Sequence, residues 1–297
     1  MLRNEFLRRT CWLHFLLVCP GVVCGMAQNT HGPSGEGGRP PGVLETEYVQ
    51  TGLFVFSGAG GNSVLRLSGN GLIVVDGNHA ENYDELRRRI HRISEQPVRV
   101  LVNTDYFERH TGTNAKFLAD GTHVVGQANE RGLLESYNPP SGKIAVPSDV
   151  FDKEQKLHFG LVEVDLLSFG KGVTGGDTVV YFPDLKAVAL GDLYVQVPVP
   201  DYGAGGSLVG WGKALGEVLK LDFDVAVPGV GPTVKKADVA ALKEKVDMVV
   251  SRGRDLVRHG VGKDKLMARL KVDDPGWKLA FTGAELDGFY GELVATK

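Results

Sequence analysis

Cysteine is scarce in this sequence and is confined to its beginning. The 297 residues include three cysteines, and all of them, Cys11, Cys19 and Cys24, precede the segments with globular patterning. A chain that starts beyond Cys24 has no disulfide, no thiolate metal ligand and no cysteine nucleophile. Core packing therefore has to supply its stability.

A strong charge of one sign is also missing. The formal net charge is −3 at pH 7, so no basic field favours a nucleic-acid partner. The hydrophobic fraction of 42% and the charged fraction of 23% are those of an ordinary globular protein. A chain of this length is large enough to bury a sizeable core.

Common catalytic motifs are absent as well. No Gly-x-Ser-x-Gly nucleophile elbow occurs. The sequence Gly212-Lys213-Ala214 is not a phosphate-binding loop, because alanine stands where serine or threonine would hold Mg²⁺. The segment 58–63 lacks the last glycine of a dinucleotide-binding loop. These absences exclude the simplest routes to serine-hydrolase, nucleotide and dinucleotide chemistry.

The first 42 residues have the composition of an export signal and a linker. Arginines at positions 3, 8 and 9 precede an apolar stretch from Cys11 to Cys24, and Gly25-Met26-Ala27 offers a small-x-small cleavage site. This pattern predicts a signal peptide over 1–27, cleaved after Ala27, and a periplasmic or secreted protein. The alternative is an uncleaved anchor, although the run is too short and interrupted for a spanning helix. Residues 28–42, rich in glycine and proline, predict a flexible tether.

The rest of the chain, 43–297, alternates between strand-like and helix-like patterns and is expected to form one layered α/β domain. Apolar runs and turn residues predict strands at 49–56, 63–67, 71–76, 98–102, 122–125, 161–168, 178–182, 187–190 and 225–227. Helical spacing of apolar residues predicts helices over 83–93, 208–219 and 239–257, the last capped by Gly260.

Three segments carry a more specific signal. They are Val102-Asn-Thr-Asp-Tyr-Phe-Glu-Arg-His-Thr-Gly-Thr-Asn114, Gly170–Pro183 running on to Leu193, and Val227-Pro-Gly-Val-Gly-Pro232. In order and spacing they resemble the signature segments of the metallo-β-lactamase superfamily, and the resemblance covers roughly residues 43–297. It implies an αββα four-layer sandwich, with the site at one edge where loops 103–114, 170–177, 192–207 and 228–233 converge. It also implies hydrolysis of an ester, amide, lactam or thioester by zinc-bound hydroxide.

The zinc ligands that the resemblance implies are mostly replaced. The family pattern Asn-Thr-His-x-His-x-Asp-His-x-Gly reads here with Asp105, Phe107 and Arg109 in place of the first three ligands, and only His110 is kept. In the later segments valine replaces both histidines, at Val173 and Val230, while the bridging aspartate is matched by Asp192. Carbon side chains cannot bind zinc, and a guanidinium would repel it.

Two interpretations of function follow. The first is an exported pseudoenzyme: a catalytically depleted hydrolase homologue that has no cofactor and binds an unknown small molecule or protein partner. The second is a metal-dependent hydrolase that uses one weakly held zinc ion at Asp105, His110 and Asp192. No residue is assigned a catalytic role in the first interpretation. Without metal, His110 could be an ordinary buried helix-start histidine and Asp192 the cap of a turn.

The remaining candidates would line the site or support it. Asp76 aligns with an aspartate that supports the metal loop in the family, but could equally accept backbone hydrogen bonds. Phe107, Val173 and Val230 are expected to fill the emptied metal site, buried and close together. Arg109 is expected to bridge Asp105 and Asp192. Two further residues are placed more coarsely: Tyr194 at the mouth of a pocket, and Gln127 in a loop.

Overall fold

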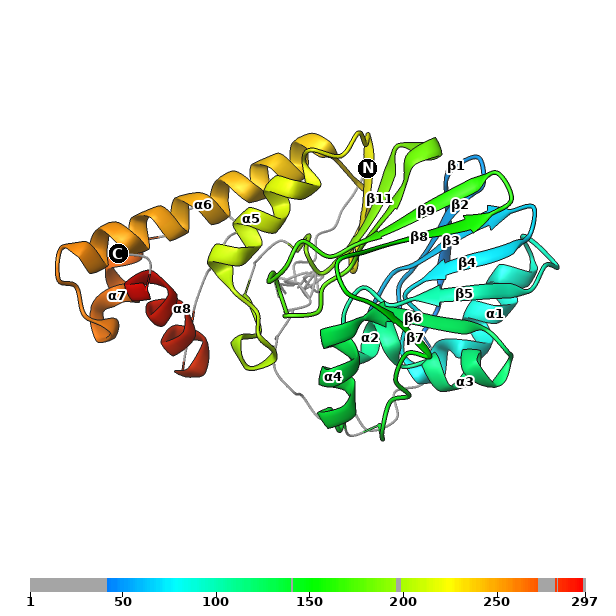
Figure 1. Ribbon diagram of the computed structural model, residues 1–297, viewed down its shortest axis with the longest axis horizontal. Coiled ribbons are helices and arrows are strands. Elements are labelled where there is room, and N and C mark those ends of the chain that lie inside the picture. The colour runs from blue at the N-terminus through cyan, green and yellow to red at the C-terminus, as the bar shows by residue number, and fades with distance from the viewer. Residues whose placement is uncertain (1–41, 140, 196–198, 272–280, 282, 296–297) are drawn as a thin grey trace, which may run out of the picture. The chain divides into compact units, whose positions relative to one another are not determined.

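Two β-sheets stacked between two layers of helices form the framework of the structure, a computed structural model (Figure 1). It describes residues 42–139, 141–195, 199–271, 281 and 283–295. The predicted signal peptide and nearly all of the predicted tether lie outside the described residues. The αββα sandwich expected from the sequence is confirmed.

The first sheet has seven strands in chain order, β1 to β7. Strands β1 to β4 form an antiparallel meander, and β4, β5, β6 and β7 run parallel. The strands are β1 (Glu45–Gln50), β2 (Leu53–Ser57), β3 (Ser63–Ser68), β4 (Gly71–Val75), β5 (Val98–Val102), β6 (His123–Gln127) and β7 (Asp149–Phe151).

The second sheet has six strands in the order β13-β12-β11-β10-β9-β8. Only β11 and β12 pair in parallel. The strands are β8 (Glu154–Phe159), β9 (Val162–Leu167), β10 (Val179–Phe182), β11 (Ala187–Gly191), β12 (Val225–Pro228) and β13 (Val234–Lys235).

Helices cover the outer face of each sheet. The first sheet carries α1 (Tyr83–His91), α2 (Glu108–Thr111), α3 (Asn114–Ala119) and α4 (Ala128–Ser136), and the second carries α5 (Leu208–Val218) and α6 (Lys236–Arg258). Two further helices, α7 (Lys263–Leu270) and α8 (Gly283–Ala295), pack against α6. Short 3-10 turns lie at η1 (Ala80–Asn82), η2 (Pro183–Leu185) and η3 (Tyr202–Ala204).

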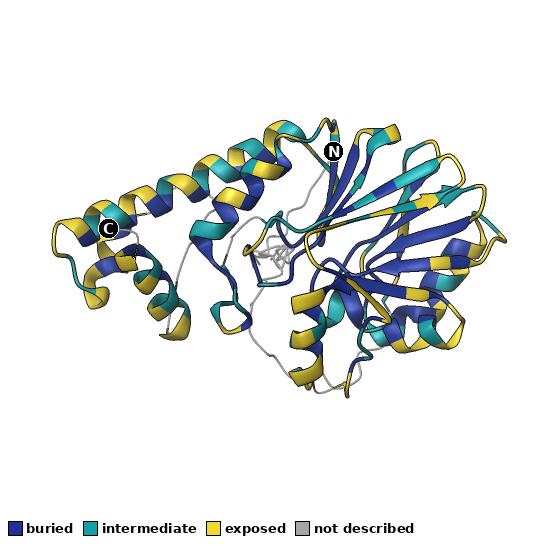
Figure 2. Cartoon of the chain, in the orientation of Figure 1, coloured by how far each residue is buried: buried dark blue, intermediate teal, exposed yellow. Residues whose placement is uncertain are grey.

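Alternation along the strands divides the core into layers. In β4, Ile73 and Val75 face the space between the sheets, whereas Leu72 and Val74 face α1 and α3. Because side chains of a strand alternate between its two faces, a strand buried on both sides reads as a continuous apolar run. In Figure 2 the inner strands are dark blue along most of their length, whereas β1 and β8 are exposed or half-buried.

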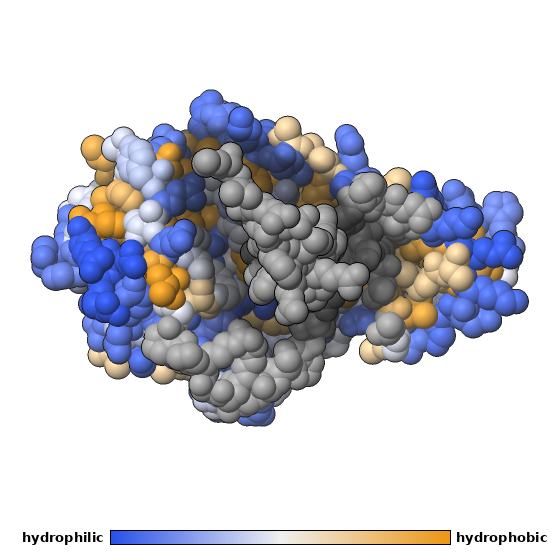
Figure 3. Space-filling model, turned by 180° about the vertical axis from the view of Figure 1, so that it is seen from behind, coloured by the Kyte–Doolittle hydropathy of each residue, from blue (hydrophilic) through white to orange (hydrophobic). Residues whose placement is uncertain are grey.

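The described surface is mainly polar. Seen from behind, coloured residues in Figure 3 are mostly hydrophilic, with hydrophobic ones in separate spots. Large hydrophobic side chains that are exposed among the described residues are Val43, Tyr48, Val150, Leu161, Val230 and Val294. Among the described helices, none combines the length and the hydropathy that a membrane span needs.

The structure corrects the predicted elements in two places. The single strand expected over 49–56 is two strands, because Thr51 and Gly52 form a turn in which Gly52 has a φ of +78°, a conformation that favours glycine. Gln127 does not lie in a loop. It ends β6 and begins α4, where its side chain accepts a hydrogen bond from the Asn129 N–H and Glu130 completes a capping box.

Candidate functional site

The site forms where the carboxyl ends of parallel strands from both sheets meet. Asp76 follows β4, the segment from Asn103 to Asp105 follows β5, and Asp192 follows β11. The two sheets touch here, since the Asn62 N–H donates to the Gly229 carbonyl and the Thr178 N–H donates to the Thr104 carbonyl. Polar residues far apart in the chain are thereby gathered at one edge of the sandwich.

Asp76 accepts a backbone hydrogen bond, one of the two roles considered for it, and also contacts His110. Its Oδ1 accepts a hydrogen bond from the Thr104 N–H at 2.8 Å, and its Oδ2 accepts one from the Thr104 hydroxyl at 2.7 Å. The same Oδ2 lies 2.9 Å from Nδ1 of His110. Asp76 has a φ of +60°, which is unfavourable for a residue with a side chain. These contacts hold the strained residue in place.

Three carboxylates surround the buried ring of His110. Besides the Asp76 contact, Nε2 lies 3.2 Å from Oδ1 of Asp192 and 3.5 Å from Oδ2 of Asp105. Burial alone would lower the pKa of His110, but the charges of Asp105 and Asp76 outweigh it and raise that pKa. The surrounding carboxylates therefore favour the protonated form of the ring.

Arg109 forms an ion pair with Asp192. Its Nη2 donates to Oδ2 of Asp192, and the guanidinium lies over the ring of Phe107 at 4.4 Å from the centroid. The side chain of Asp192 is 1% exposed and that of Arg109 is 21% exposed. Pairing with one of the two expected carboxylates is thus observed. Bridging of both is not, because no ion pair between Arg109 and Asp105 occurs among the described residues.

Asp105 is left only partly satisfied. Its Oδ1 accepts a hydrogen bond from the Phe107 N–H at 2.9 Å, but its buried Oδ2 has no hydrogen-bond partner in the described part of the chain. Burial raises the pKa of Asp105, against the charges of His110 and Arg109. Ligand atoms of Asp105, His110 and Asp192 lie within 4.8 Å of one another, a group that could hold one metal ion.

The three carbon side chains at former ligand positions do not share one cavity. Val173 is 1% exposed and belongs to the core formed with α5 and α6. Phe107 is half-buried and packs on Tyr106, with ring centroids 4.6 Å apart. Val230 is 38% exposed. The expectation that all three are buried together is wrong for Val230, because its loop borders open space, and for Phe107, which is only half-buried.

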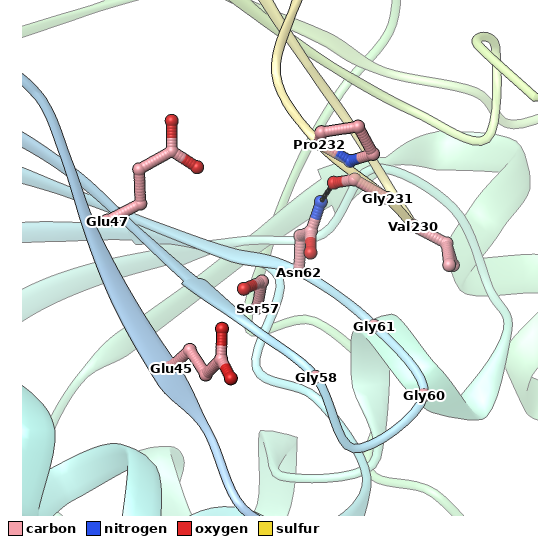
Figure 4. A pocket seen from close by; sticks show the side chains of 10 residues that line it. All are labelled: Glu45, Glu47, Ser57, Gly58, Gly60, Gly61, Asn62, Val230, Gly231 and Pro232. Carbon is pink, nitrogen blue, oxygen red and sulfur yellow. Dashed lines mark hydrogen bonds between the residues drawn. The ribbon is translucent and has the colours of Figure 1, made fainter.

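That open space is a cavity of about 460 Å³ beside Val230, and Figure 4 shows the residues that line it. The side chains of Glu45 and Glu47 border it from β1, and Asn62 Nδ2 donates to the Gly231 carbonyl on the other side. Gly61 in its wall lies against the backbone of Arg109. Tyr194 is not among the residues that line this cavity; it is half-buried and packs against the core beneath α5.

Several polar residues of the site were not anticipated. Tyr106 donates its phenolic hydrogen to Oδ2 of Asp201 at 2.6 Å. Asp177 accepts a hydrogen bond from the Thr174 hydroxyl at 2.6 Å, and burial raises its pKa to about 8. Burial also raises the pKa of Glu130 well above its usual range. The glutamate three residues after Gln127 was a readable capping signal, whereas nothing in the sequence pairs Tyr106 with Asp201.

Comparison with known proteins agrees with this architecture. No family model matches the sequence. Among solved structures, a metallo-β-lactamase from Pontibacter korlensis aligns with a TM-score of 0.62 at 19% identity, covering 69% of this chain and 99% of that one. The metallo-β-lactamase DIM-1 aligns with a TM-score of 0.59 at 18% identity, covering 69% and 97%. The chain has the metallo-β-lactamase fold, and part of it extends beyond these structures.

Proposed function

We propose that this protein is an exported pseudoenzyme with the metallo-β-lactamase fold, which binds a small molecule or a partner and does not use a two-zinc centre. The observation that carries the proposal is the ion pair between Arg109 and Asp192. Asp192 occupies the position of the bridging ligand, and one of its oxygens is already engaged by a cation. A fixed guanidinium thus stands where a second metal ion would have to be.

The donor set supports the same proposal. Zinc sites need nitrogen, sulfur or oxygen ligands at defined geometry, and Phe107, Val173 and Val230 offer none. Two divalent ions beside the half-buried guanidinium of Arg109 would be strongly repelled. The residues present therefore do not fit two zinc ions. His110 and Arg109 instead offset the charge of the three surrounding aspartates.

The cavity beside Val230 supports the binding role. It adjoins the site edge through Gly61, it is open to solvent, and its volume of about 460 Å³ is within the range of small-molecule sites. The side chain at 230 that would be a metal ligand in the family is here an apolar part of the wall. We place the ligand in this cavity.

Metal analysis of the purified protein tests the proposal. After dialysis against zinc and then buffer, we expect well under one zinc per chain by mass spectrometry, and no hydrolysis of a chromogenic β-lactam above background. A variant with Asp105→His, Phe107→His, Arg109→Asp, Val173→His and Val230→His serves as the positive control and should take up zinc. About two zinc ions per unmodified chain would overturn the proposal.

A second function, hydrolysis with one bound ion, is favoured by a single observation. Oδ2 of Asp105 is buried without a hydrogen-bond partner among the described residues, and such an atom is costly unless something binds it. One ion could be held by Asp105, His110 and Asp192. Calorimetric titration with zinc and manganese separates the two functions. Binding of one ion that is lost in Asp105→Asn, but kept in the exposed control Glu47→Gln, would favour the second.

Export is part of the proposal and is tested separately. The arginines at 3, 8 and 9, the apolar stretch to Cys24 and the Gly25-Met26-Ala27 site support cleavage after Ala27. Expressed in a bacterial host with its full sequence, the protein should accumulate in the envelope or medium with Gln28 as its first residue, as determined by mass spectrometry. Recovery of an intact chain beginning at Met1 from the cytoplasm would contradict export.

A further inference from the structure

The C-terminal helix α8 packs on the loop that leads into α5. Tyr202, in η3, donates its phenolic hydrogen to Oε2 of Glu292 at 3.1 Å, and the Val209 N–H also points to that oxygen, at 3.4 Å. The ring of Tyr202 lies so close to Gly288 that a Cβ added there would collide with it. A carboxylate at the first turn of α5 is favourable because that end of a helix carries positive charge. In Figure 1, α8 lies beside this loop.

The same loop is bound to the second signature segment by backbone hydrogen bonds. The Asp201 N–H donates to the Val173 carbonyl at 2.7 Å, and the Ser207 N–H donates to the Gly172 carbonyl at 2.9 Å. In the other direction the Gly175 N–H donates to the Ala204 carbonyl at 2.8 Å. Residues 201–207 therefore form a cover over residues 172–175.

The cover also reaches the first signature segment. Asp201 accepts the hydrogen bond of Tyr106 at 2.6 Å, and Tyr106 packs on Phe107. The guanidinium of Arg109 in turn stacks on the face of the Phe107 ring. A continuous series of contacts thus connects α8 to the ion pair at the site, although the two are far apart in the chain.

We propose that α8 is a C-terminal strap, and that Tyr202 and Glu292 are positioning residues through which it holds the cover 201–207 on both signature segments. Without the strap, the cover loosens. Tyr106 then loses its partner, and Phe107 no longer fixes the guanidinium. The strap acts in the same way whether the site binds one ion or none, so this proposal stands independently of the proposed function.

Two glycines of α8 offer a matched test. Gly288→Ala inserts a methyl group against the ring of Tyr202, whereas Gly291→Ala meets nothing within 4 Å. Both changes raise helix propensity equally, so they differ only in the contact with the cover. Hydrogen exchange followed by mass spectrometry should show at least about tenfold faster exchange of segments 172–175, 201–207 and 107–111 in Gly288→Ala. In Gly291→Ala these segments should exchange as in the parent.

Strand β5 serves as the internal reference for global unfolding. If the β5 amides also exchange faster in Gly288→Ala, that variant has lost global stability. The conservative variant Tyr202→Phe then tests the local effect, because it removes only the hydroxyl that contacts Glu292 and the Leu208 N–H. That variant should loosen 201–207 and 107–111 with β5 unchanged. Loosening of 201–207 alone would show that the cover does not position Tyr106 and Phe107. If exchange in these segments is unchanged in both variants, α8 is not a strap. Either result overturns the proposal.

Discussion

Two loops of the site carry valine at positions where the family resemblance places histidine, with different structural results. Val173 is buried in the core, whereas Val230 is 38% exposed beside an open cavity. The first loop is covered by residues 201–207 through backbone hydrogen bonds. The second is bordered by the glycine-rich loop 58–61, which has few side chains to pack against it. One side of the site is closed and the other is open.

The comparison shows that replacing a polar ligand does not itself close a site. An apolar residue becomes part of a core only when other elements bring atoms to pack against it. On the closed side those atoms come from the cover and α5, and Arg109 pairs with the buried carboxylate of Asp192. On the open side the emptied position contributes to a cavity, and this is the side where we place a ligand.

The largest effect is expected from breaking the charge pair on the closed side. Arg109→Ala leaves the buried carboxylate of Asp192 with only His110 beside it, which should lower the free energy of unfolding by about 3 kcal/mol at neutral pH. This loss is near the lower end of the range for removing one partner of a buried ion pair, because part of the guanidinium reaches solvent. Urea denaturation followed by circular dichroism measures the loss.

Arg88 provides the matched control for that change. It pairs with Glu85 at 2.6 Å, but its side chain is 65% exposed. A helical pair whose cation lies mostly in solvent contributes about 0.5 kcal/mol or less, and Glu85 keeps Arg89 as a second partner, so Arg88→Ala should be nearly neutral. Equal losses for Arg109→Ala and Arg88→Ala would mean that the charge of Asp192 is stabilised by something other than Arg109.

The two valines give the most direct test of the comparison. Val173→Ala removes two buried methyl groups and should cost about 2 kcal/mol of unfolding free energy. Val230→Ala removes the same atoms from an exposed side chain and should cost less than about 0.5 kcal/mol. Each variant is the control for the other, since the chemistry is identical. Similar costs at the two positions would remove the distinction between a closed and an open side.

The sequence predicted the layers of the fold and the edge at which the site lies. The continuous apolar run of a strand such as β4, which is buried on both faces, is a local property, so apolar runs and turns located most strands correctly. The segments 102–114 and 227–232 also converge as expected. What the sequence could not predict is which former ligand position is covered, because the cover depends on contacts such as that of Tyr106 with Asp201, 95 residues apart.

The same limit explains the misplaced expectation for Phe107. A fully buried phenylalanine would cost about 3–5 kcal/mol on truncation, but the ring here is half-buried between Tyr106 and Arg109. Aromatic residues at a former metal site can cap a charge as well as fill a hole. Whether Phe107 caps a charge or fills a cavity depends on where the guanidinium of Arg109 lies. That position is set by the ion pair with Asp192, which follows a strand of the other sheet.

The smallest effect is a pH dependence that the closed side should show. Asp177 is buried beneath the cover, and burial raises its pKa to about 8, whereas an unfolded aspartate titrates near ~4. Between these values the folded state keeps a proton that the unfolded state has lost. Stability therefore falls as pH rises through this window, by about 1 kcal/mol between pH 6 and pH 7. Denaturation of the parent at the two pH values measures the fall.

Asp177→Asn should abolish that contribution, because the amide does not titrate while its oxygen can still accept the Thr174 hydrogen bond. Burial also raises the pKa of Glu130, so Glu130 too makes the folded state less stable as pH rises. The parent and the variant therefore have to be compared at both pH values. The difference between their two changes isolates Asp177. Glu47→Gln removes one carboxylate from the open side. This variant should show the same fall in stability between pH 6 and pH 7 as the parent, because Asp177 is still present. An equal fall in Asp177→Asn would mean that water reaches Asp177 and that the cover does not seal this side.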